Sequence, residues 1–274
     1  MTQIHPGAVG IFDSGLGMLS ILPHIRQLLP QARFACLADQ AFFPYGNKDE
    51  ALIRQRMVAL IPEFVRQTRP SLIVLACNTA STSALQEIRN ILTIPVVGVV
   101  PAIKPAAELS ESKITGILAT SATISSPYTR QLIDAHASHC QVILQASHLL
   151  AGYAESYRLS GIRPDPKLIK KELGLLIAGK PDTVALACTH FPLIREFLEP
   201  FLPGVRVWTE PGPGVAKQVK KILSDISAET ELSNPGTSLF WSTSDEFTAN
   251  HQSIELFNEQ RAEVSYFGFT KAGD

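Results

Sequence analysis

Short runs of aliphatic and β-branched residues alternate along the chain with longer stretches whose apolar residues recur at helical spacing. The runs predict eight strands: Val9–Asp13, Arg33–Ala38, Leu72–Ala76, Val96–Val99, Ile114–Ala119, Gln141–Gln145, Thr183–Ala187 and Val205–Thr209. The intervening stretches predict helices, among them Met18–Leu29, Asp49–Thr68, Thr79–Leu92 and Lys167–Ala178. This alternation is typical of parallel sheets built from right-handed βαβ units. Because the strands are apolar throughout, we expect helices on both faces of each sheet.

The chain repeats itself at a nearly constant offset. The segment Val9–Gly15 has a counterpart in Ile114–Ser121, and two similar strands ending in cysteine lie 111 residues apart. A general likeness of βα units could also produce this repeat. We favour an α/β fold of two pseudo-symmetric, doubly wound parallel-sheet domains with an active site in the cleft between them.

The chain after residue 211 is expected to return to the first domain. It offers a helix, a polar linker, a strand, a second helix and a final strand, predicted at Val215–Ser224, Ser227–Gly236, Ser238–Trp241, Asp245–Phe257 and Glu263–Phe267. We therefore expect the first domain to comprise residues 1–99 and 212–274 and the second to comprise residues 100–211.

Composition narrows the functional class. The chain has 274 residues, of which 45% are hydrophobic and 18% charged, with a formal net charge of −1. This balance predicts a protein with a real core, without nucleic-acid or membrane partners. No signal peptide or membrane-spanning run is recognisable, so a cytoplasmic location is expected. The four cysteines could form two disulfides, but we expect them to be reduced thiols.

Cys77 and Cys188 have a different sequence setting from Cys36 and Cys140, which we expect to be structural residues. Each ends an apolar run and precedes a polar residue at the expected start of a helix, in Ala76-Cys-Asn-Thr79 and Ala187-Cys-Thr-His190. Only about 3% of an ordinary thiol is ionised at pH 7, and a helix N-terminus raises that fraction. One thiolate and one thiol on opposite sides of a carbon atom would form a base and an acid. The pair therefore predicts inversion of a stereocentre by proton transfer, although a cysteine in an apolar run is more often a core residue.

Other polar residues follow the same strand ends, where ligands bind in open α/β sheets. Asp13 and His190 are expected to assist one thiol each. Ser14, Asn78, Thr79 and Thr189 can cap helices or, with the backbone N–H groups, hold a carboxylate.

Cofactor motifs are weak or missing. Gly15-Leu-Gly17 lacks the third glycine of a dinucleotide loop, no phosphate-binding Walker motif occurs, and the histidines do not pair at metal-ligand spacing. We therefore expect neither a cofactor nor a metal. A lysine Schiff base to pyridoxal phosphate stays open, but no phosphate-binding loop supports it.

These motifs together resemble the cofactor-independent aspartate/glutamate racemase superfamily, and in particular its glutamate racemases. The resemblance extends over essentially the whole length. It rests on the segments Gly10–Gly17, Pro44–Gly46 with Lys48, Leu75–Ser81, Val97–Pro105, Ala187–Leu193 and Phe240–Thr243.

The resemblance implies an isomerase that interconverts L- and D-glutamate and supplies D-glutamate for peptidoglycan. Cys77 and Cys188 would be the two bases, acting on the D- and the L-isomer respectively. Asp13, His190 and Glu155 would assist them. Substrate contacts are implied for Asp13, Ser14, Tyr45, Gly46, Asn78, Thr79, Thr189 and His190. Many members have Cys-Pro where this chain has Ser147-His148, a departure that concerns the local geometry of the second domain.

Alternatives remain at this point. An aspartate or hydantoin racemase, a one-thiol decarboxylase of the same superfamily, or a non-catalytic amino-acid-binding protein would share many of these features. A homodimer and activation by a cell-wall precursor are also left open.

Overall fold

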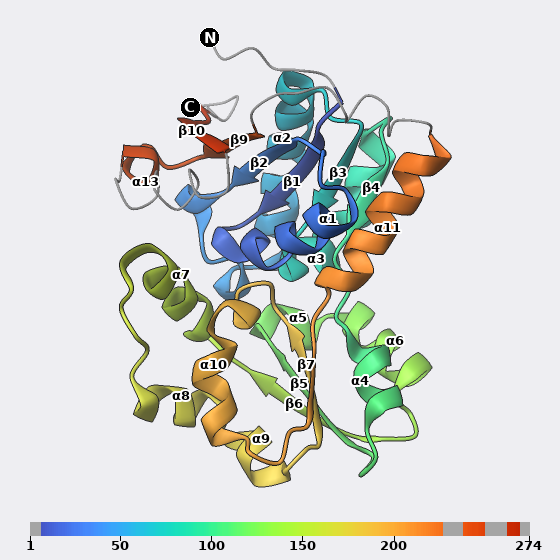
Figure 1. The fold of residues 1–274 in the computed structure, drawn as a ribbon, viewed down its shortest axis with the longest axis vertical. Coiled ribbons are helices and arrows are strands. Elements are labelled where there is room, and N and C mark those ends of the chain that lie inside the picture. Colours follow the sequence, from blue (N-terminus) through green and yellow to red (C-terminus); the bar gives the residue numbers. More distant parts are fainter. Residues whose placement is uncertain (1–6, 227–237, 250–261, 269–274) are drawn as a thin grey trace.

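The computed structural model describes residues 7–226, 238–249 and 262–268. It contains two separate parallel sheets with helices packed around them, one in the upper and one in the lower half of Figure 1. The six-stranded sheet has the order β10-β9-β2-β1-β3-β4 and the four-stranded sheet the order β6-β5-β7-β8. The expected α/β fold with two parallel-sheet domains is confirmed. Below, the first domain is the unit around the six-stranded sheet and the second domain the unit around the four-stranded sheet.

Three predicted strands have the observed bounds, and the others differ by one or two residues at one or both ends. The strands are β1 (Val9–Asp13), β2 (Phe34–Ala38), β3 (Leu72–Leu75), β4 (Val96–Gly98), β5 (Ile114–Ala119), β6 (Gln141–Ala146), β7 (Thr183–Ala187), β8 (Val207–Thr209), β9 (Ser238–Ser242) and β10 (Ala262–Tyr266). Consecutive residues of one strand point to opposite faces of the sheet: on β1, Ile11 packs in one hydrophobic cluster and Phe12 in another. Helices therefore cover both faces of the sheet, as uniformly apolar parallel strands require.

The helices follow the predicted alternation. The α-helices are α1 (Leu22–Leu28), α2 (Glu50–Thr68), α3 (Asn78–Ile91), α4 (Ile103–Leu109), α5 (Ser121–Ser125), α6 (Pro127–His136), α7 (Leu150–Ser160), α8 (Pro166–Glu172), α9 (Gly174–Gly179), α10 (Arg195–Leu198), α11 (Gly212–Asp225) and α13 (Asp245–Ala249). Short 3₁₀ helices are η1 (Leu16–Ser20), η2 (Gln40–Phe42), η3 (Tyr45–Asn47), η4 (Phe191–Ile194) and η5 (Glu199–Phe201).

Two predicted helices are each divided into two pieces. The stretch Met18–Leu29 becomes η1 followed by α1, with Pro23 in the first turn of α1, where its missing N–H is tolerated. The stretch Lys167–Ala178 becomes α8 and α9, because Leu173 leaves helical geometry between them.

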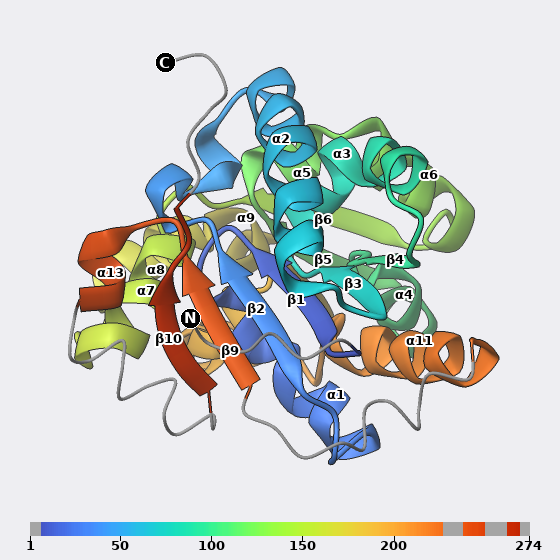
Figure 2. The same ribbon diagram turned by 90° about the horizontal axis from the view of Figure 1, so that it is seen from above.

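The chain crosses between the domains twice, and the tail lies in the first sheet. The β4–α4 and β8–α11 connections make the crossings: Ile103 of α4 packs in the second domain and Val219 of α11 in the first. β9 pairs with β2 and β10 with β9, as Figure 2 shows in the view from above. The predicted linker Ser227–Gly236 and the second half of the predicted helix Asp245–Phe257 lie outside the described residues, and the domain boundaries stay a prediction.

Candidate active site

The carboxyl ends of β1, β3 and β7 from the two sheets meet around a small cavity between the domains. Both Cys77 and Cys188 line it, although they belong to different sheets. The full lining is Ser14, Phe43, Pro44, Tyr45, Gly46, Asn47, Cys77, Asn78, Thr79, Thr120, Ser147, His148, Ala151, Cys188, Thr189 and His190. At about 20 Å³ the cavity has room for one or two water molecules. In this arrangement the cavity is therefore too small to hold an amino acid.

Cys77 is held as a buried thiol. Its Sγ lies 3.6 Å from the Oγ of Ser14, to which it donates, and accepts from the N–H of Ala80 at 3.5 Å. Burial and the neighbouring Asp13 carboxyl raise the pKa of Cys77 to about 12. In this closed arrangement Cys77 is suited to donate a proton.

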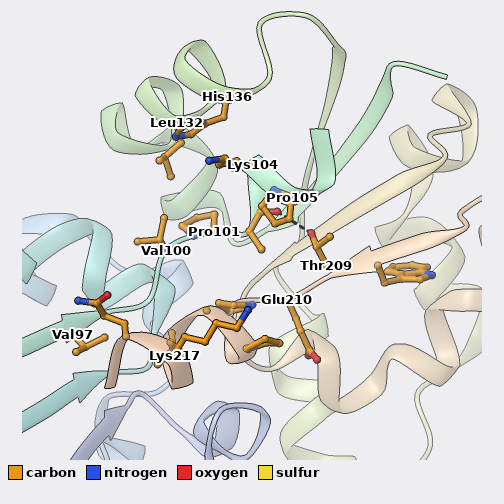
Figure 3. Close-up of a pocket in the computed structure, with 18 of the residues that line it drawn as sticks. Val97, Val100, Pro101, Lys104, Pro105, Leu132, His136, Thr209, Glu210 and Lys217 are labelled. Carbon is orange, nitrogen blue, oxygen red and sulfur yellow. Dashed lines mark hydrogen bonds between the residues drawn. The ribbon is translucent and has the colours of Figure 1, made fainter. Parts of the chain in front are cut away.

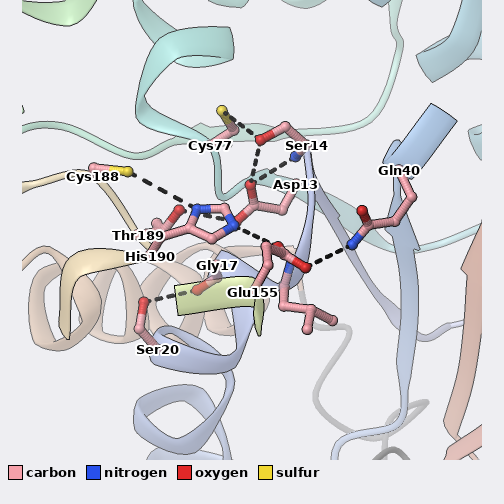
Figure 4. A network of polar contacts seen from close by, with 11 residues as sticks. Asp13, Ser14, Gly17, Ser20, Gln40, Cys77, Glu155, Cys188, Thr189 and His190 are labelled. Carbon is pink, nitrogen blue, oxygen red and sulfur yellow. Dashed lines mark hydrogen bonds and ion pairs between the residues drawn. The ribbon is translucent and has the colours of Figure 1, made fainter. Parts of the chain in front are cut away.

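Cys188 has a different partner. Its Sγ lies 3.9 Å from Nδ1 of His190, whose Nε2 is 2.7 Å from Oε1 of Glu155 (Figure 4). Burial lowers the pKa of His190, but the contacts with Cys188 and Glu155 outweigh it and hold that pKa well above its ordinary value. A protonated imidazole beside sulfur stabilises a thiolate. The two thiols thus have different neighbours: Cys77 contacts Ser14 and the N–H of Ala80, whereas Cys188 contacts the imidazole of His190.

Asp13 lies behind the cavity and joins the two domains. Its Oδ2 accepts from the hydroxyl of Thr189 at 3.0 Å, and its Oδ1 accepts from the N–H of Ser14 at 2.7 Å. Burial raises the pKa of Asp13 to about 6, although His190 and Thr189 oppose the rise. The carboxyl is therefore mostly ionised at neutral pH and lies among Cys77, His190 and Thr189.

None of Ser14, Asn78, Thr79 and Thr189 takes a helix N-cap, one of the two roles open to them. Cys77 itself occupies the N-cap of α3, so Asn78 and Thr79 are already helical, and Gly15 and His190 occupy the N-caps of η1 and η4. The sulfur of Cys77 replaces the expected amide or hydroxyl as acceptor for the first helical turn. The carboxyamide of Asn78 is buried, and neither its Oδ1 nor its Nδ2 has a hydrogen-bond partner in the described part of the chain. An unpaired polar group at the cavity wall is a candidate ligand contact.

Tyr45 and Gly46 form one wall of the cavity. The phenol of Tyr45 donates to Oδ2 of Asp39 at 2.7 Å, and burial together with Asp39 raises its pKa well above the ordinary value. The hydroxyl is thereby committed to Asp39. A side chain at Gly46 would overlap Thr120 of the second domain, so glycine permits the close approach of the domains here.

The cavity lining includes residues that sequence reasoning did not single out. Thr120 directly follows β5 and its Oγ1 is 3.0 Å from that of Thr79, so its place at a strand end was a usable signal. Ser147 and His148, which the sequence marked only as a departure from Cys-Pro, also line the cavity, and Ser147 donates to Glu172 at 2.5 Å. Asp13 and Glu155 do not line the cavity, but contact residues that do.

A larger cavity of about 880 Å³ lies where both crossing segments pass between the domains. Figure 3 shows Lys104 and Lys217 along its walls, together with apolar residues such as Val100 and Leu132. It contains none of the thiol, imidazole and carboxyl groups described above.

The described residues offer neither a membrane-spanning helix nor a cluster of metal ligands. None of the helices there has both the length and the apolar character needed to cross a bilayer. No group of three or more His, Cys, Asp or Glu within those residues is arranged to hold a metal ion.

Comparisons with known proteins agree with this geometry. The sequence profile of the Asp/Glu/Hydantoin racemase family matches residues 18–209. Glutamate racemase from Histophilus somni (strain 2336) is 44% identical over 223 residues, which are 81% of this chain and 83% of the relative. Glutamate racemase from Shewanella sp. (strain MR-7) is 41% identical over 81% of each chain.

Solved structures show the same fold. Escherichia coli glutamate racemase, in complex with L-glutamate and the activator UDP-MurNAc-ala, has a TM-score of 0.84 and 35% identity, covering 95% of this chain and 98% of that one. The Thermus thermophilus enzyme in complex with β-chloro-D-alanine has a TM-score of 0.75 and 27% identity, covering 96% of this chain and 97% of that one. The chain therefore belongs to the Asp/Glu/Hydantoin racemase family.

Proposed function

We propose that this protein interconverts L- and D-glutamate by a two-thiol proton transfer at the α-carbon and so supplies D-glutamate for peptidoglycan synthesis. The observation on which the proposal depends is that Cys77 and Cys188, from different sheets, line one cavity between the domains. Relatives named glutamate racemase at 41–44% identity support glutamate as the substrate.

The contrasting environments of the two thiols suggest where the cycle begins. Cys188, beside protonated His190, starts as the thiolate and removes the α-proton of L-glutamate. Cys77, with its raised pKa, delivers its proton to the opposite face. Cys188 ends as the thiol and Cys77 as the thiolate, and D-glutamate is converted by the reverse sequence. Every proton removed is replaced, and no electrons leave the system.

The developing charge on the substrate needs stabilisation. Asn78 has an unpaired amide, and Ser14, Thr79 and Thr189 present hydroxyls around the cavity. We assign these residues to the substrate carboxylates, where donors aimed at the growing enediolate charge lower the barrier. Tyr45 and Gly46 would contact the substrate through ring and backbone, since the Tyr45 hydroxyl is bound to Asp39. Closing of the domains excludes water and strengthens these contacts.

The test is isotope incorporation. The purified protein is incubated in D₂O with L-glutamate, D-glutamate or L-aspartate, while circular dichroism follows racemisation and mass spectrometry follows deuterium at Cα. Both glutamate isomers should lose rotation and gain one deuterium. Preference for aspartate, release of CO₂, or binding of glutamate without exchange would each refute the proposal in favour of a different family activity or of a binding protein.

Single-cysteine variants test the mechanism. Cys77→Ser and Cys188→Ser should each lower racemisation by roughly 10²–10⁴-fold, the usual range for loss of a general acid or base. Cys140→Ser is the matched control, because that half-buried thiol contacts the Ala107 carbonyl, away from the site. Normal activity in either site variant contradicts the two-thiol mechanism.

We also infer regulation through the larger cavity. Both crossing segments line it, and Lys104 and Lys217 offer positive charge to an anionic ligand. The E. coli relative's complex with an activator supports a comparable ligand, a cell-wall precursor, in this chain. UDP-MurNAc-ala should raise kcat, Lys217→Met should weaken that response, and Lys220→Met, on the same helix outside the cavity, should not. An unchanged rate with the precursor would refute this inference.

A further inference from the structure

The carboxylate of Glu155 is held by groups from both domains. Glu155 lies on α7 in the second domain and is 7% exposed. Its Oε1 accepts from the backbone N–H of Leu16 at 2.5 Å, and its Oε2 accepts from the side-chain amide of Gln40 at 3.0 Å. Leu16 and Gln40 both belong to the first domain, so two of the donors to this buried carboxylate arrive from across the domain interface.

Gln40 is itself firmly placed. It begins η2 directly after Asp39, a buried residue whose carboxylate accepts two bonds from Arg56 and one from Thr243. On the other side of the carboxylate, a side chain at Gly15 would overlap Oε1 of Glu155. The first domain therefore forms a closely packed binding site for the Glu155 carboxylate, and Gln40 is its side-chain donor (Figure 4).

We propose that Gln40 is a positioning residue for the proton-transfer site, holding the Glu155 carboxylate against His190, the imidazole that contacts Cys188. The inference rests on the proposed function and deepens it. Gln40 does not line the substrate cavity, so it acts through Glu155 and His190 rather than on glutamate.

The charges around His190 give the direction of the effect. Glu155 from α7, Cys188 from the end of β7 and Asp13 from β1 all face it, and Cys77 lies beyond Asp13. Removing the Gln40 amide leaves Oε2 of Glu155 without its side-chain donor and frees the carboxylate to turn away from Nε2 of His190. The contact with Glu155 that raises the pKa of His190 is then weaker, so His190 loses its proton at lower pH.

The experiment measures kcat and KM of the full-length protein for L-glutamate across pH, in wild type and Gln40→Met. The alkaline limb of kcat, which reports ionisations in the substrate complex, should move downward by about one pH unit, a tenfold loss of kcat above the limb. KM should stay within about twofold, because the cavity is untouched.

Two controls separate positioning from a general structural effect. Gln86→Met removes a comparable amide bond, to Asn90 on the exposed face of α3, and should leave the profile unchanged. In a Glu155→Gln background, Gln40→Met should have almost no further effect on kcat, as coupled residues are not additive.

An unshifted alkaline limb in Gln40→Met, a loss expressed in KM, or full additivity with Glu155→Gln would overturn the role of Gln40. If wild type itself does not racemise glutamate, the proposed function fails, and that result is distinct from failure of the Gln40 variants in an active enzyme.

Discussion

The hydroxyl of Thr189 donates a 3.0 Å hydrogen bond to the carboxylate of Asp13, 176 residues away in the chain. Thr189 follows β7 of the second domain and Asp13 ends β1 of the first. The bond thus links the two domains beside the cavity. Both residues are buried, with 1% and 0% of their surface exposed, so the bond is shielded from water.

Thr189→Val should test this interdomain bond at nearly constant side-chain volume. A hydrogen bond to a charged group contributes about 1.5–3 kcal/mol, so kcat/KM for glutamate should fall by roughly 10- to 100-fold. Thr189→Ser keeps the hydroxyl and should recover most of the activity. Wild-type kinetics in the valine variant, measured by circular dichroism, would show that the bond does not contribute to catalysis.

The raised pKa of Asp13 predicts that the free energy of unfolding falls as the pH rises. Burial first, opposed by His190 and Thr189, raises the pKa from 3.8 to about 6, so the folded protein binds this proton more tightly than the unfolded chain does. The resulting stabilisation is present below the unfolded pKa and is lost as the pH rises to about 6. A shift of this size corresponds to ~3 kcal/mol.

Asp13→Asn stays neutral and should escape that loss. Its free energy of unfolding relative to wild type should therefore rise by ~3 kcal/mol between about pH 4 and about pH 7. Urea unfolding at several pH values between these limits measures the difference, with Asp134→Asn on the surface helix α6 as the control. A difference independent of pH would contradict the raised pKa.

The strands and the two cysteines were predictable because their signals are local. A uniformly apolar run ending in a polar residue marks both a parallel strand and its carboxyl end, and this placed Cys77 and Cys188 at one edge each. The resemblance, rather than any local pattern, pointed to Glu155, which is one glutamate in an ordinary amphipathic helix. Its pairing with His190 depends on the packing of α7 against η4.

Contacts made across the domain interface could not be predicted from the chain alone. Phe43 packs its ring 5.4 Å from that of His190, and His148 reaches toward Asn47 of the opposite domain at 3.4 Å. Motif residues flank Phe43 and Asn47 in the sequence, but their partners lie in the other domain, more than 100 residues away along the chain. Asn78 could have capped α3, but the sulfur of Cys77 accepts from the first helical turn and Asn78 lies inside the helix.

Gly15 should not tolerate alanine, although its backbone is extended and any residue could adopt it. The added Cβ would overlap Oε1 of Glu155 and press on the ring of Phe43, so Gly15→Ala should displace the carboxylate and lower kcat by at least tenfold. Gly152→Ala is the matched control on α7, where the Cβ meets nothing within 4 Å. It should keep activity and raise the free energy of unfolding by ~0.5–1 kcal/mol, as alanine favours helix. Equal activities in the two variants would contradict the close packing at Gly15.

Asn78 should lower the stability of the substrate-free protein and strengthen the binding of glutamate. Its amide is 2% exposed and has no partner among the described residues, a situation that costs about 1–3 kcal/mol in the absence of a ligand. Asn78→Ala removes the unpaired groups, so the substrate-free protein should be at least as stable as wild type. The same variant should bind glutamate at least tenfold more weakly, which calorimetry and the thermal shift on adding glutamate both measure.

The opposite pattern at Asn78 would identify a structural residue. If Asn78→Ala loses stability while its dissociation constant for glutamate is unchanged, the amide supports the start of α3 and does not contact the substrate. Asn78→Asp sharpens the distinction, because its negative charge would repel a substrate carboxylate. A substrate-contacting position should therefore bind glutamate more weakly with aspartate than with alanine, whereas a purely structural one should show equal affinities.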